Sequence, residues 1–211
     1  MLTVVIGASR GIGAALAAAV PGEVVGTSRA GGGGLVALDL AGAADFGPLL
    51  DRLDGRPLDA LICNAGVFPD RHERIEDGYP PEMWAEALAV NVAGPFRAVQ
   101  AVLPNLRAAR GKVMIVSSQM GASDHAGGGA YIYKASKAAA INLALGLAAD
   151  LKRDGIAVGV YHPGWVRTDM GGAGAAISPE ESAAGLLERL SRLDLDTAGR
   201  FETWDGRAHA L

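Results

Sequence analysis

The sequence predicts an α/β fold in which a mostly parallel sheet of seven strands carries helices on both faces. Short runs rich in Val, Ile and Leu alternate with longer stretches rich in Ala and Leu, a pattern typical of strand–helix–strand units. Half of the 211 residues are hydrophobic and 20% are charged, which suits helices packed on a buried sheet. A single domain is expected, because domains commonly hold about 100 to 200 residues.

Each strand is expected where an apolar run stands between turn residues, and each helix where Ala and Leu dominate. The strands are predicted at residues 3–6, 23–27, 35–38, 58–63, 112–117, 156–161 and 200–203. The helices are predicted at 12–19, 46–53, 81–109 with a bend near Gly94 and Pro95, 131–153, and 179–193. Ser178 begins the last helix, since a capping hydroxyl is followed by a first-turn proline and two acids. Right-handed crossovers then give a doubly wound sheet whose ligand site lies at the carboxyl ends of the strands.

Charge and cysteine content limit the partners and the compartment. A net charge of -4 and a pI near 5.5 give no broad positive field, so neither nucleic acid nor a membrane is expected as a partner. Cys63 is the only cysteine, which excludes an internal disulfide and suits a reducing compartment such as the cytoplasm. The N-terminal run lacks a basic leader, and no apolar segment approaches the roughly 18 residues of a membrane span. Neither a signal peptide nor a transmembrane helix is therefore expected.

Glycines follow the first predicted strand at the point where the next helix begins. The run Gly7-Ala8-Ser9-Arg10-Gly11-Ile12-Gly13 has the spacing G-x-x-x-G-x-G. Glycines placed in this way let the backbone turn tightly and approach a pyrophosphate, whose charge is met by free N–H groups at the helix N-terminus. The alternative is a turn that binds nothing, because a glycine motif alone is a weak signal.

This spacing resembles the nucleotide motif of the short-chain dehydrogenases/reductases, and further matches extend along nearly the whole chain. The run from His162 to Gly172 looks like that of the sniffer-type and C-factor-type carbonyl reductases. The resemblance implies a single Rossmann-type domain over residues 1–211, with an expected strand order of 3-2-1-4-5-6-7. Its NADP-binding half is expected to span about 1–110 and its catalytic half about 111–211.

The residues after the second strand indicate which nicotinamide cofactor is bound. An NAD-selective site usually holds a carboxylate there, which binds the ribose hydroxyls and repels a 2′-phosphate. Ser28 occupies this place and Arg29 follows it. Arg10 lies in the glycine loop, so two guanidinium groups are expected to converge on the phosphate. NADP(H) is therefore preferred and NAD(H) left open; the alternative for both arginines is a solvated surface charge.

The family resemblance assigns further cofactor contacts along the strand ends. They are Asp39 and Leu40 near the adenine, Asn64, Ala65 and Gly66 beneath the cofactor, and Pro163, Gly164, Val166 and Thr168 near the nicotinamide amide. Asp39 has the alternative of a loop or capping acid. The Asn-Ala-Gly run also has a partly structural role, because its small residues let the backbone pass under the cofactor.

Tyr133 and Lys137 stand four residues apart in a predicted helix, so their side chains share one face. A phenol titrates near pH 10, but an ammonium about 4 Å away is worth roughly 4 kcal/mol, or about three pKa units, at an effective dielectric near 20. Lys137 is therefore expected to lower the pKa of Tyr133 toward neutrality, against the cost of burying a phenolate. Such pairs also arise by chance in helices. Tyr131 has no lysine partner, because Ala135 stands four residues after it. Lys134 is next to Tyr133 in sequence and therefore points off this face.

The resemblance completes the catalytic set with Ser118 and Asn91. Ser118 follows the fifth strand at the carboxyl edge of the sheet, where its hydroxyl is expected to polarise a substrate carbonyl. Ser117 faces the other way by strand alternation and is expected to be structural. Asn91 resembles the family asparagine whose backbone helps to hold a water that links the lysine to solvent. The loop 121–129 is expected to shape the substrate pocket.

Together these residues predict an oxidoreductase that moves a hydride between NADP(H) and a small carbonyl compound or alcohol. Tyr133 is the expected acid/base, and Lys137 is also expected to bind the nicotinamide ribose. Two alternatives stand beside this prediction, because a fold alone does not establish chemistry. One is a nucleotide-binding regulatory or signalling protein of the C-factor type, and the other is an NAD-linked alcohol dehydrogenase.

The remaining candidates give weaker predictions. The four histidines, His72, His125, His162 and His209, show no ligand spacing in the sequence, so no metal site is expected. Cys63 has neither a paired base nor a redox motif beside it and is expected to be a small buried residue. A monomer, a homodimer and a homotetramer all remain open.

Overall fold

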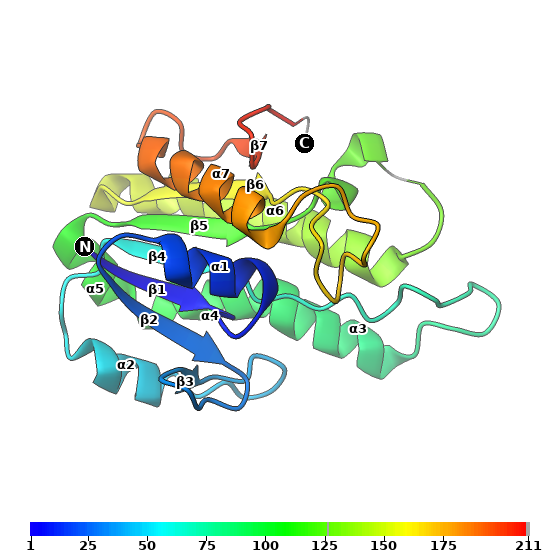
Figure 1. The fold of residues 1–211 in the computed structure, drawn as a ribbon, viewed down its shortest axis with the longest axis horizontal. Coiled ribbons are helices and arrows are strands. Elements are labelled where there is room, and N and C mark those ends of the chain that lie inside the picture. Colours follow the sequence, from blue (N-terminus) through cyan, green and yellow to red (C-terminus); the bar gives the residue numbers. More distant parts are fainter. Residues whose placement is uncertain (126, 210–211) are drawn as a thin grey trace.

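The computed structural model describes residues 1–125 and 127–209, and its centre is one parallel sheet (Figure 1). The strands are β1 (Leu2–Ile6), β2 (Glu23–Ser28), β3 (Val36–Ala37), β4 (Ala60–Cys63), β5 (Lys112–Val116), β6 (Ala157–His162) and β7 (Phe201–Thr203). Their order is β3-β2-β1-β4-β5-β6-β7, which confirms the prediction. The pairings between these strands are all parallel, where a mostly parallel sheet was expected.

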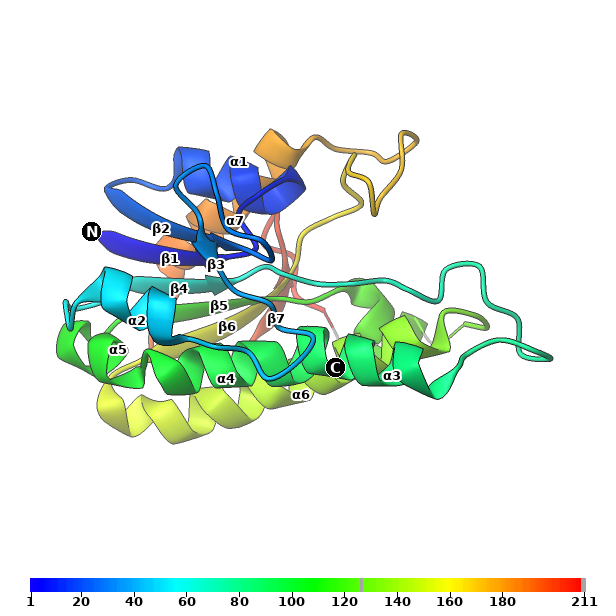
Figure 2. The same cartoon turned by 90° about the horizontal axis from the view of Figure 1, so that it is seen from below.

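Helices cover both faces of the sheet (Figure 2). On one face lie α1 (Gly11–Ala19) and α7 (Pro179–Arg192), which pack against each other. On the other face lie α2 (Gly47–Leu53), α4 (Gly94–Ala101), α5 (Leu103–Ala109) and α6 (Tyr131–Leu151), and α3 (Pro81–Leu88) continues the line of α4 beyond the strand ends. The carboxyl ends of the strands therefore open between two helical layers.

The core follows the alternation of the strands. Val4, Leu61 and Val113 are buried in the layer that includes α4, α5 and α6, whereas their neighbours Val5, Ile62 and Met114 are buried in the layer that includes α1 and α7. Because helices cover both faces of the sheet, successive residues of one strand point to opposite faces and are all buried. This explains why the central strands consist of continuous apolar runs.

The long helix predicted at 81–109 is interrupted twice, which corrects the single bend expected near Gly94 and Pro95. A π-helical turn, Ala89–Ala93, separates α3 from α4, and a break at Val102 separates α4 from α5. Pro104 lies in the first turn of α5, where a missing N–H costs no helical hydrogen bond. Pro95, the second residue of α4, follows the π turn, whose last residue, Ala93, is already helical. The π turn carries Asn91, and such turns are frequent at functional sites.

The last helix begins as its sequence predicts. The Ser178 hydroxyl accepts a hydrogen bond from Glu181 N at 3.1 Å, and the Glu181 carboxylate accepts one from Ser178 N at 2.7 Å. This reciprocal cap satisfies two donors at the start of α7. The α7 N-terminus is thereby fixed directly after the turn that follows β6.

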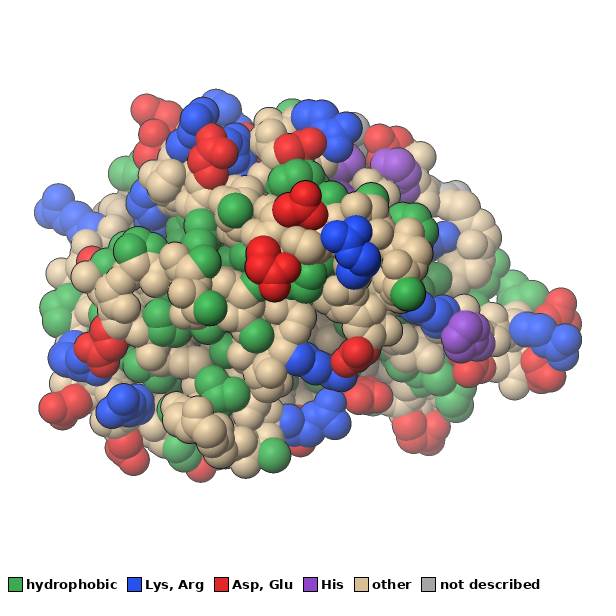
Figure 3. Space-filling model, in the orientation of Figure 1, with side chains coloured by type: hydrophobic (Ala, Val, Ile, Leu, Met, Phe, Trp, Pro, Cys, Tyr) green, Lys and Arg blue, Asp and Glu red, His purple; other side chains and the backbone are tan. Residues whose placement is uncertain are grey.

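One face of the molecule carries charges of both signs. Acidic and basic side chains are interspersed over the face drawn in Figure 3. None of the described helices combines the length and the apolar character that crossing a membrane requires. The residues that the sequence assigns to a functional site lie at the carboxyl edge of the sheet.

Candidate active site

A cleft of about 490 Å³ lies at the carboxyl ends of the strands. That volume falls within the range of about 300 to 1,000 Å³ typical of sites for small ligands. The predicted cofactor residues line it, with the exception of Gly13, Gly164 and Val166. Ser118 and Asn91 lie outside its lining. The sequence-derived residues from distant parts of the chain are thus largely brought together around one cleft.

The glycine loop is packed so closely that side chains would not fit. Gly7 has φ +84°, and a Cβ there would lie 2.9 Å from Ala65 Cα. A Cβ on Gly13 would lie 1.9 Å from Gly7 O. The Asn64 amide donates to Gly7 O at 2.9 Å and so joins the loop to the end of β4. Gly13 therefore acts behind the cleft, by letting α1 approach the loop.

The N-terminus of α1 faces this cleft with its first turn open. Within the described part of the chain, no side chain caps that turn, and it contains no acidic residue. Gly11 and Ile12, its first two residues, line the cleft. Unpaired N–H groups and the positive end of the helix favour an anion here. The loop thus fits the pyrophosphate of a dinucleotide.

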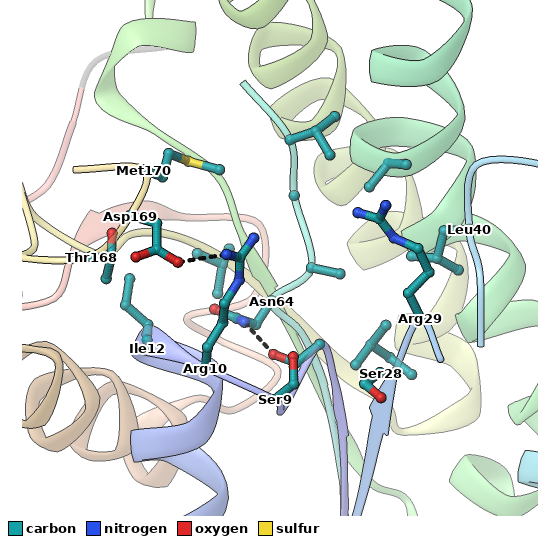
Figure 4. A pocket seen from close by; sticks show the side chains of 18 of the residues that line it. Ser9, Arg10, Ile12, Ser28, Arg29, Leu40, Asn64, Thr168, Asp169 and Met170 are labelled. Atoms are coloured by element: carbon teal, nitrogen blue, oxygen red, sulfur yellow. Dashed lines mark hydrogen bonds and ion pairs between the residues drawn. The ribbon is translucent and has the colours of Figure 1, made fainter. Parts of the chain in front are cut away.

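The two arginines expected to converge on a phosphate lie on opposite sides of the cleft (Figure 4). Arg10 Nη1 donates to Asp169 Oδ2 at 2.5 Å, an exposed ion pair between the glycine loop and the segment after β6. Arg29 lies across the cleft beside Ser28 and Leu40. The expected convergence is therefore not seen, because Asp169 offers Arg10 a carboxylate partner. Ser28, the last residue of β2, and Arg29 directly after it occupy the predicted place at the cleft.

The other predicted cofactor residues differ in how directly they face the cleft. Asp39 lines it but also accepts a hydrogen bond from Ala41 N at 2.9 Å, so the loop-acid interpretation describes part of its role. Thr168 lines it and packs near Gly11, where an added Cβ would lie 3.0 Å from Thr168 Cγ2. Val166 is buried and pairs with Ile177, and Gly164, at φ +88°, turns the chain against Trp204. These two shape the turn from behind.

Tyr133 lies in the first turn of α6, with its phenol beside Ser118. Its side chain is 7% exposed, and the side chain of Ser118, which follows β5, lies near enough to lower its pKa. Ser117 Oγ donates to the carbonyl of Lys137 at 2.9 Å, a structural role consistent with the expectation. Two hydroxyl groups from different elements therefore meet next to the cleft.

The pKa of Tyr133 runs opposite to the prediction. Burial raises it above the ordinary value of a phenol, and the hydrogen bond from Ser118 and the charge of Arg71 oppose that rise. The expected lowering by Lys137 is not seen, because its amine lies 5.7 Å from the Tyr133 ring centre and donates to Val116 O at 3.1 Å. Burial also lowers the pKa of Lys137 to about 8. Because the pKa of Tyr133 is raised, its phenol is protonated at neutral pH.

Asn91 anchors the segment after β4 through its side chain. Its amide exchanges two hydrogen bonds of 2.9 Å with the backbone of Val67 and donates a third to Ser136 Oγ. Gly66 lies above it, and a Cβ there would be 3.3 Å from both Asn91 Oδ1 and Lys137 Nζ. The expected backbone contact to a water is untested. The side-chain contacts to Val67 and α6 are additional to the expectation.

Three other reactive side chains near the site, those of Tyr131, Lys134 and Cys63, take no part in the Tyr133 contacts described above. Tyr131 is 41% exposed and packs edge-on against Tyr79. Lys134 donates to the carbonyls of Gly127 and Gly128, away from Tyr133. Cys63 is buried, and burial raises its pKa to about 12, so its thiol is inert at neutral pH.

Three residues beside Tyr133 were not found by sequence reasoning. The Phe68 ring stacks on the Tyr133 ring with centres 4.1 Å apart, and the Arg71 guanidinium lies 5.0 Å from the Phe68 ring centre. Asp70, between them in sequence, is fully buried and accepts hydrogen bonds from the start of α6. No local pattern marks Phe68 and Asp70, since they contact the start of α6 from more than 60 positions away.

The histidines are less scattered than the sequence suggested. The His209 ring centre lies 6.0 Å from that of His125 and 5.9 Å from that of His162. The described residues contain no group of three or more side chains that could hold a metal ion. His162 is buried with no hydrogen-bond partner for Nδ1 among these residues. Burial, followed by the nearby His209 and His125, lowers the pKa of His162 to about 4.

We expect His162 to make the protein sensitive to acid. Its imidazole titrates near 6.5 in an unfolded chain, so between about pH 6.5 and 4 the unfolded state binds more protons than the folded state. The free energy of unfolding therefore falls as the pH falls, by about 2 to 3 kcal/mol in that window. Chemical denaturation at pH 7 and 4.5 should show a smaller loss for His162→Gln than for the exposed-site control His72→Gln. Equal losses in both variants would contradict this assignment.

Comparisons with known proteins agree with this architecture. A family model for short chain dehydrogenase matches residues 36–176. The C-signal protein of Myxococcus xanthus is 39% identical over 153 residues, which cover 71% of this chain and 90% of that protein.

Solved structures share the whole fold. The NADPH-bound carbonyl reductase from chicken fatty liver is 26% identical, with a TM-score of 0.85 over 99% of this chain and 98% of that chain. The carbonyl reductase Sniffer of D. melanogaster has a TM-score of 0.86 over 100% of this chain and 98% of that chain, and at 23% identity it supports the fold alone. With a family model matched over well more than half its length, the chain belongs to the short-chain dehydrogenase family, as its motifs indicated.

Proposed function

We propose that the protein is an NADP(H)-dependent carbonyl reductase that converts a small aldehyde, ketone or quinone to an alcohol, or catalyses the reverse reaction. The observation that carries this proposal is the buried Tyr133 phenol, which lies beside the Ser118 hydroxyl at the edge of a cleft lined by the predicted cofactor residues. The phenol can donate a proton, and the second hydroxyl can help to hold a carbonyl oxygen. A raised pKa keeps the phenol protonated at neutral pH, which is the state that a proton donor requires.

The cleft residues suit each part of the cofactor. The glycine loop and the open first turn of α1 would hold the pyrophosphate, and Ser28 and Arg29 the 2′-phosphate. Asp39 and Leu40 would meet the adenine, and Thr168 the nicotinamide amide. When bound, NADPH supplies the hydride. A solved relative with NADPH, the carbonyl reductase from chicken fatty liver, supports this choice of cofactor.

The protein's own groups then act on the substrate oxygen. Ser118 Oγ and the Tyr133 hydroxyl hydrogen-bond the carbonyl, which polarises it and orients the carbon toward the cleft. Tyr133 passes its proton to that oxygen as the alcohol forms. Lys137, buried and with a pKa near 8, remains largely protonated at neutral pH and would bind the ribose hydroxyls.

The proposal is tested by NADPH oxidation with a panel of aldehydes, ketones and quinones, repeated with NADH. Turnover with NADPH on at least one carbonyl class, and much weaker use of NADH, is the expected result. Turnover confined to NADH would favour an NAD-linked dehydrogenase instead. No turnover with any carbonyl or alcohol, despite cofactor binding, would contradict the proposed activity.

Cofactor preference is expected to depend on Ser28 and Arg29. Ser28→Asp places a carboxylate near the 2′-phosphate, so NADPH affinity should fall by about 10- to 100-fold while NADH binding is retained or improved, a cost of about 1.4 to 2.8 kcal/mol. Arg29→Ala should weaken NADPH about tenfold and leave NADH unchanged. Fluorescence titration with both cofactors checks this, with Arg153→Ala, at an exposed position after α6, as the control. Equal loss of both cofactors would refute this role.

The likeness to C-signal supports a second candidate, a signalling protein that binds the nucleotide without needing turnover. The site argues for chemistry as well, because binding alone does not require a phenol and a hydroxyl to meet beside the cleft. The two candidates differ in whether a biological effect survives in a variant that binds cofactor but lacks Tyr133. An effect retained by such a variant would favour the signalling role.

A further inference from the structure

A short segment after β4 contacts Tyr133 from two sides. The Phe68 ring stacks on the Tyr133 ring at an interplanar angle of 19°. Two residues later, the Asp70 carboxylate accepts hydrogen bonds from Ile132 N at 2.7 Å and from Tyr133 N at 3.2 Å. Both the ring and the backbone of Tyr133 are therefore held by residues 68–70.

The Asp70 carboxylate occupies the place of a helix cap. Tyr131 is the first residue of α6, so Ile132 and Tyr133 carry the second and third amides, the donors that a capping side chain normally accepts. The residue at the capping position is Ala130, which has φ +52° and makes no side-chain hydrogen bond to the helix. Asp70 supplies that cap from a position 62 residues away in sequence.

Burial makes it costly to break the hydrogen bonds between the Asp70 carboxylate and the start of α6. Asp70 is 0% exposed, and no basic side chain forms an ion pair with it among the residues that the structure describes. Its negative charge is stabilised by the backbone amides and by the positive end of α6. Moving the carboxylate away from these donors would leave a charge and two amides unpaired in the interior. The start of α6 is therefore tied to residue 70.

The other end of the same segment is tied to α6 as well. Asn91 holds Val67 through two hydrogen bonds and donates to Ser136 Oγ, which in turn donates to Tyr133 O at 2.8 Å. The peptide amide and the carbonyl of Tyr133 are thus both fixed within one closed frame. Asp70 provides the contact on the amide side.

We propose that Asp70 is a positioning residue that sets the location of the Tyr133 phenol relative to Ser118 and the cleft. This inference rests on the proposed reductase function for its kinetic consequence, but its structural part concerns the start of α6 alone. A shift of about 1 Å in a proton donor can cost on the order of 100-fold in rate. The groups proposed to hold the pyrophosphate and the 2′-phosphate lie on the glycine loop and at the end of β2, and among the described residues the Asp70 carboxylate hydrogen-bonds only the start of α6.

The test compares Asp70→Asn and Asp70→Ala with Asp77→Asn, an exposed acid of the same connecting segment that pairs with Arg74. The asparagine keeps the volume and one acceptor oxygen, whereas alanine keeps neither. We expect kcat to fall about 10-fold for asparagine and about 100-fold for alanine, with the dissociation constant of NADPH within about twofold of the unaltered protein. Asp77→Asn should match the unaltered protein in both quantities.

Hydrogen exchange provides a readout that does not need turnover. In the unaltered protein the amides of Ile132 and Tyr133 should be protected, although first-turn amides of a helix normally exchange fast. Asp70→Ala should expose both amides, and Asp70→Asn, which keeps one acceptor oxygen, should raise their exchange rates less. A folded Asp70→Asn protein with kcat within twofold, or one that loses kcat and NADPH affinity together, overturns the positioning role. If neither variant folds, exchange of these two amides as fast as that of Tyr131 in the unaltered protein overturns it. Absence of turnover in the unaltered protein defeats the proposed function and leaves the exchange test in force.

Discussion

Tyr133→Phe is expected to lower kcat for carbonyl reduction by about 10²- to 10⁴-fold, the usual contribution of a positioned general acid. The substitution removes one oxygen and keeps the ring, so the stacking on Phe68 and the contacts of the backbone with Asp70 are retained. The proton donor and one of the two hydroxyls that hold the substrate oxygen are lost. Steady-state kinetics with saturating NADPH, together with a fluorescence titration of the cofactor, measure both effects.

The matched control is Tyr131→Phe, which removes the same atom from an exposed tyrosine two residues earlier. Its kcat should stay within about threefold of the unaltered protein, because Tyr131 lacks an ammonium at the following turn and packs on Tyr79. NADPH affinity should be unchanged in both variants. A Tyr133→Phe protein with near-normal turnover would exclude Tyr133 as the proton donor.

Gly13→Ala is expected to destabilise the protein by about 3 kcal/mol and to weaken NADPH binding about tenfold or more, the upper end of what overpacking costs. The new Cβ would lie 2.5 Å from Asn64 Nδ2 and 1.9 Å from Gly7 O, a backbone atom that no side-chain rotation can move. Helix α1 must therefore move away from β1, and the glycine loop with it. Urea unfolding and cofactor titration check the two effects.

The control for this change is Gly146→Ala, the same substitution at an exposed site within α6. An added Cβ there meets no atom within 4 Å, so the variant should gain up to about 1 kcal/mol from helix propensity and bind NADPH normally. Opposite signs for the two alanines would show that the close approach of α1 to the loop, and not helix propensity, governs position 13. A Gly13→Ala protein as stable as the unaltered one contradicts the packing argument.

Much of the fold could be predicted because it is encoded locally. Alternating short apolar runs and Ala-rich stretches give the order of strands and helices, and the right-handed crossover rule then leaves few sheet topologies. Ser178 and its following acids mark the start of α7 because every partner of the cap lies within three residues. The interruption at Ala89–Ala93 was misplaced by a few residues, since a π turn has no local signature comparable to proline.

The candidate site could be predicted only as a set of positions. Parallel strands bring their carboxyl ends to one edge, so residues after β1, β2, β4, β5 and β6 had to meet there. Which of them face the cleft was not predictable, as Gly164 and Val166 show by lying behind the turn that they form. The roles assigned to individual side chains remain predictions that the substitutions above address.

By itself, the sequence determined the succession of strands and helices, the glycine loop and the four-residue spacing that puts Tyr133 and Lys137 on one helical face, because each depends on periodicity or on neighbours in the chain. Only the tertiary structure decided the pairing of Arg10 with Asp169, the cap that Asp70 gives to α6, and the raised pKa of Tyr133. The first two join residues 159 and 62 positions apart. The third depends on how much water the folded chain removes from around a phenol, and the cost of that desolvation is set by every segment packed against it.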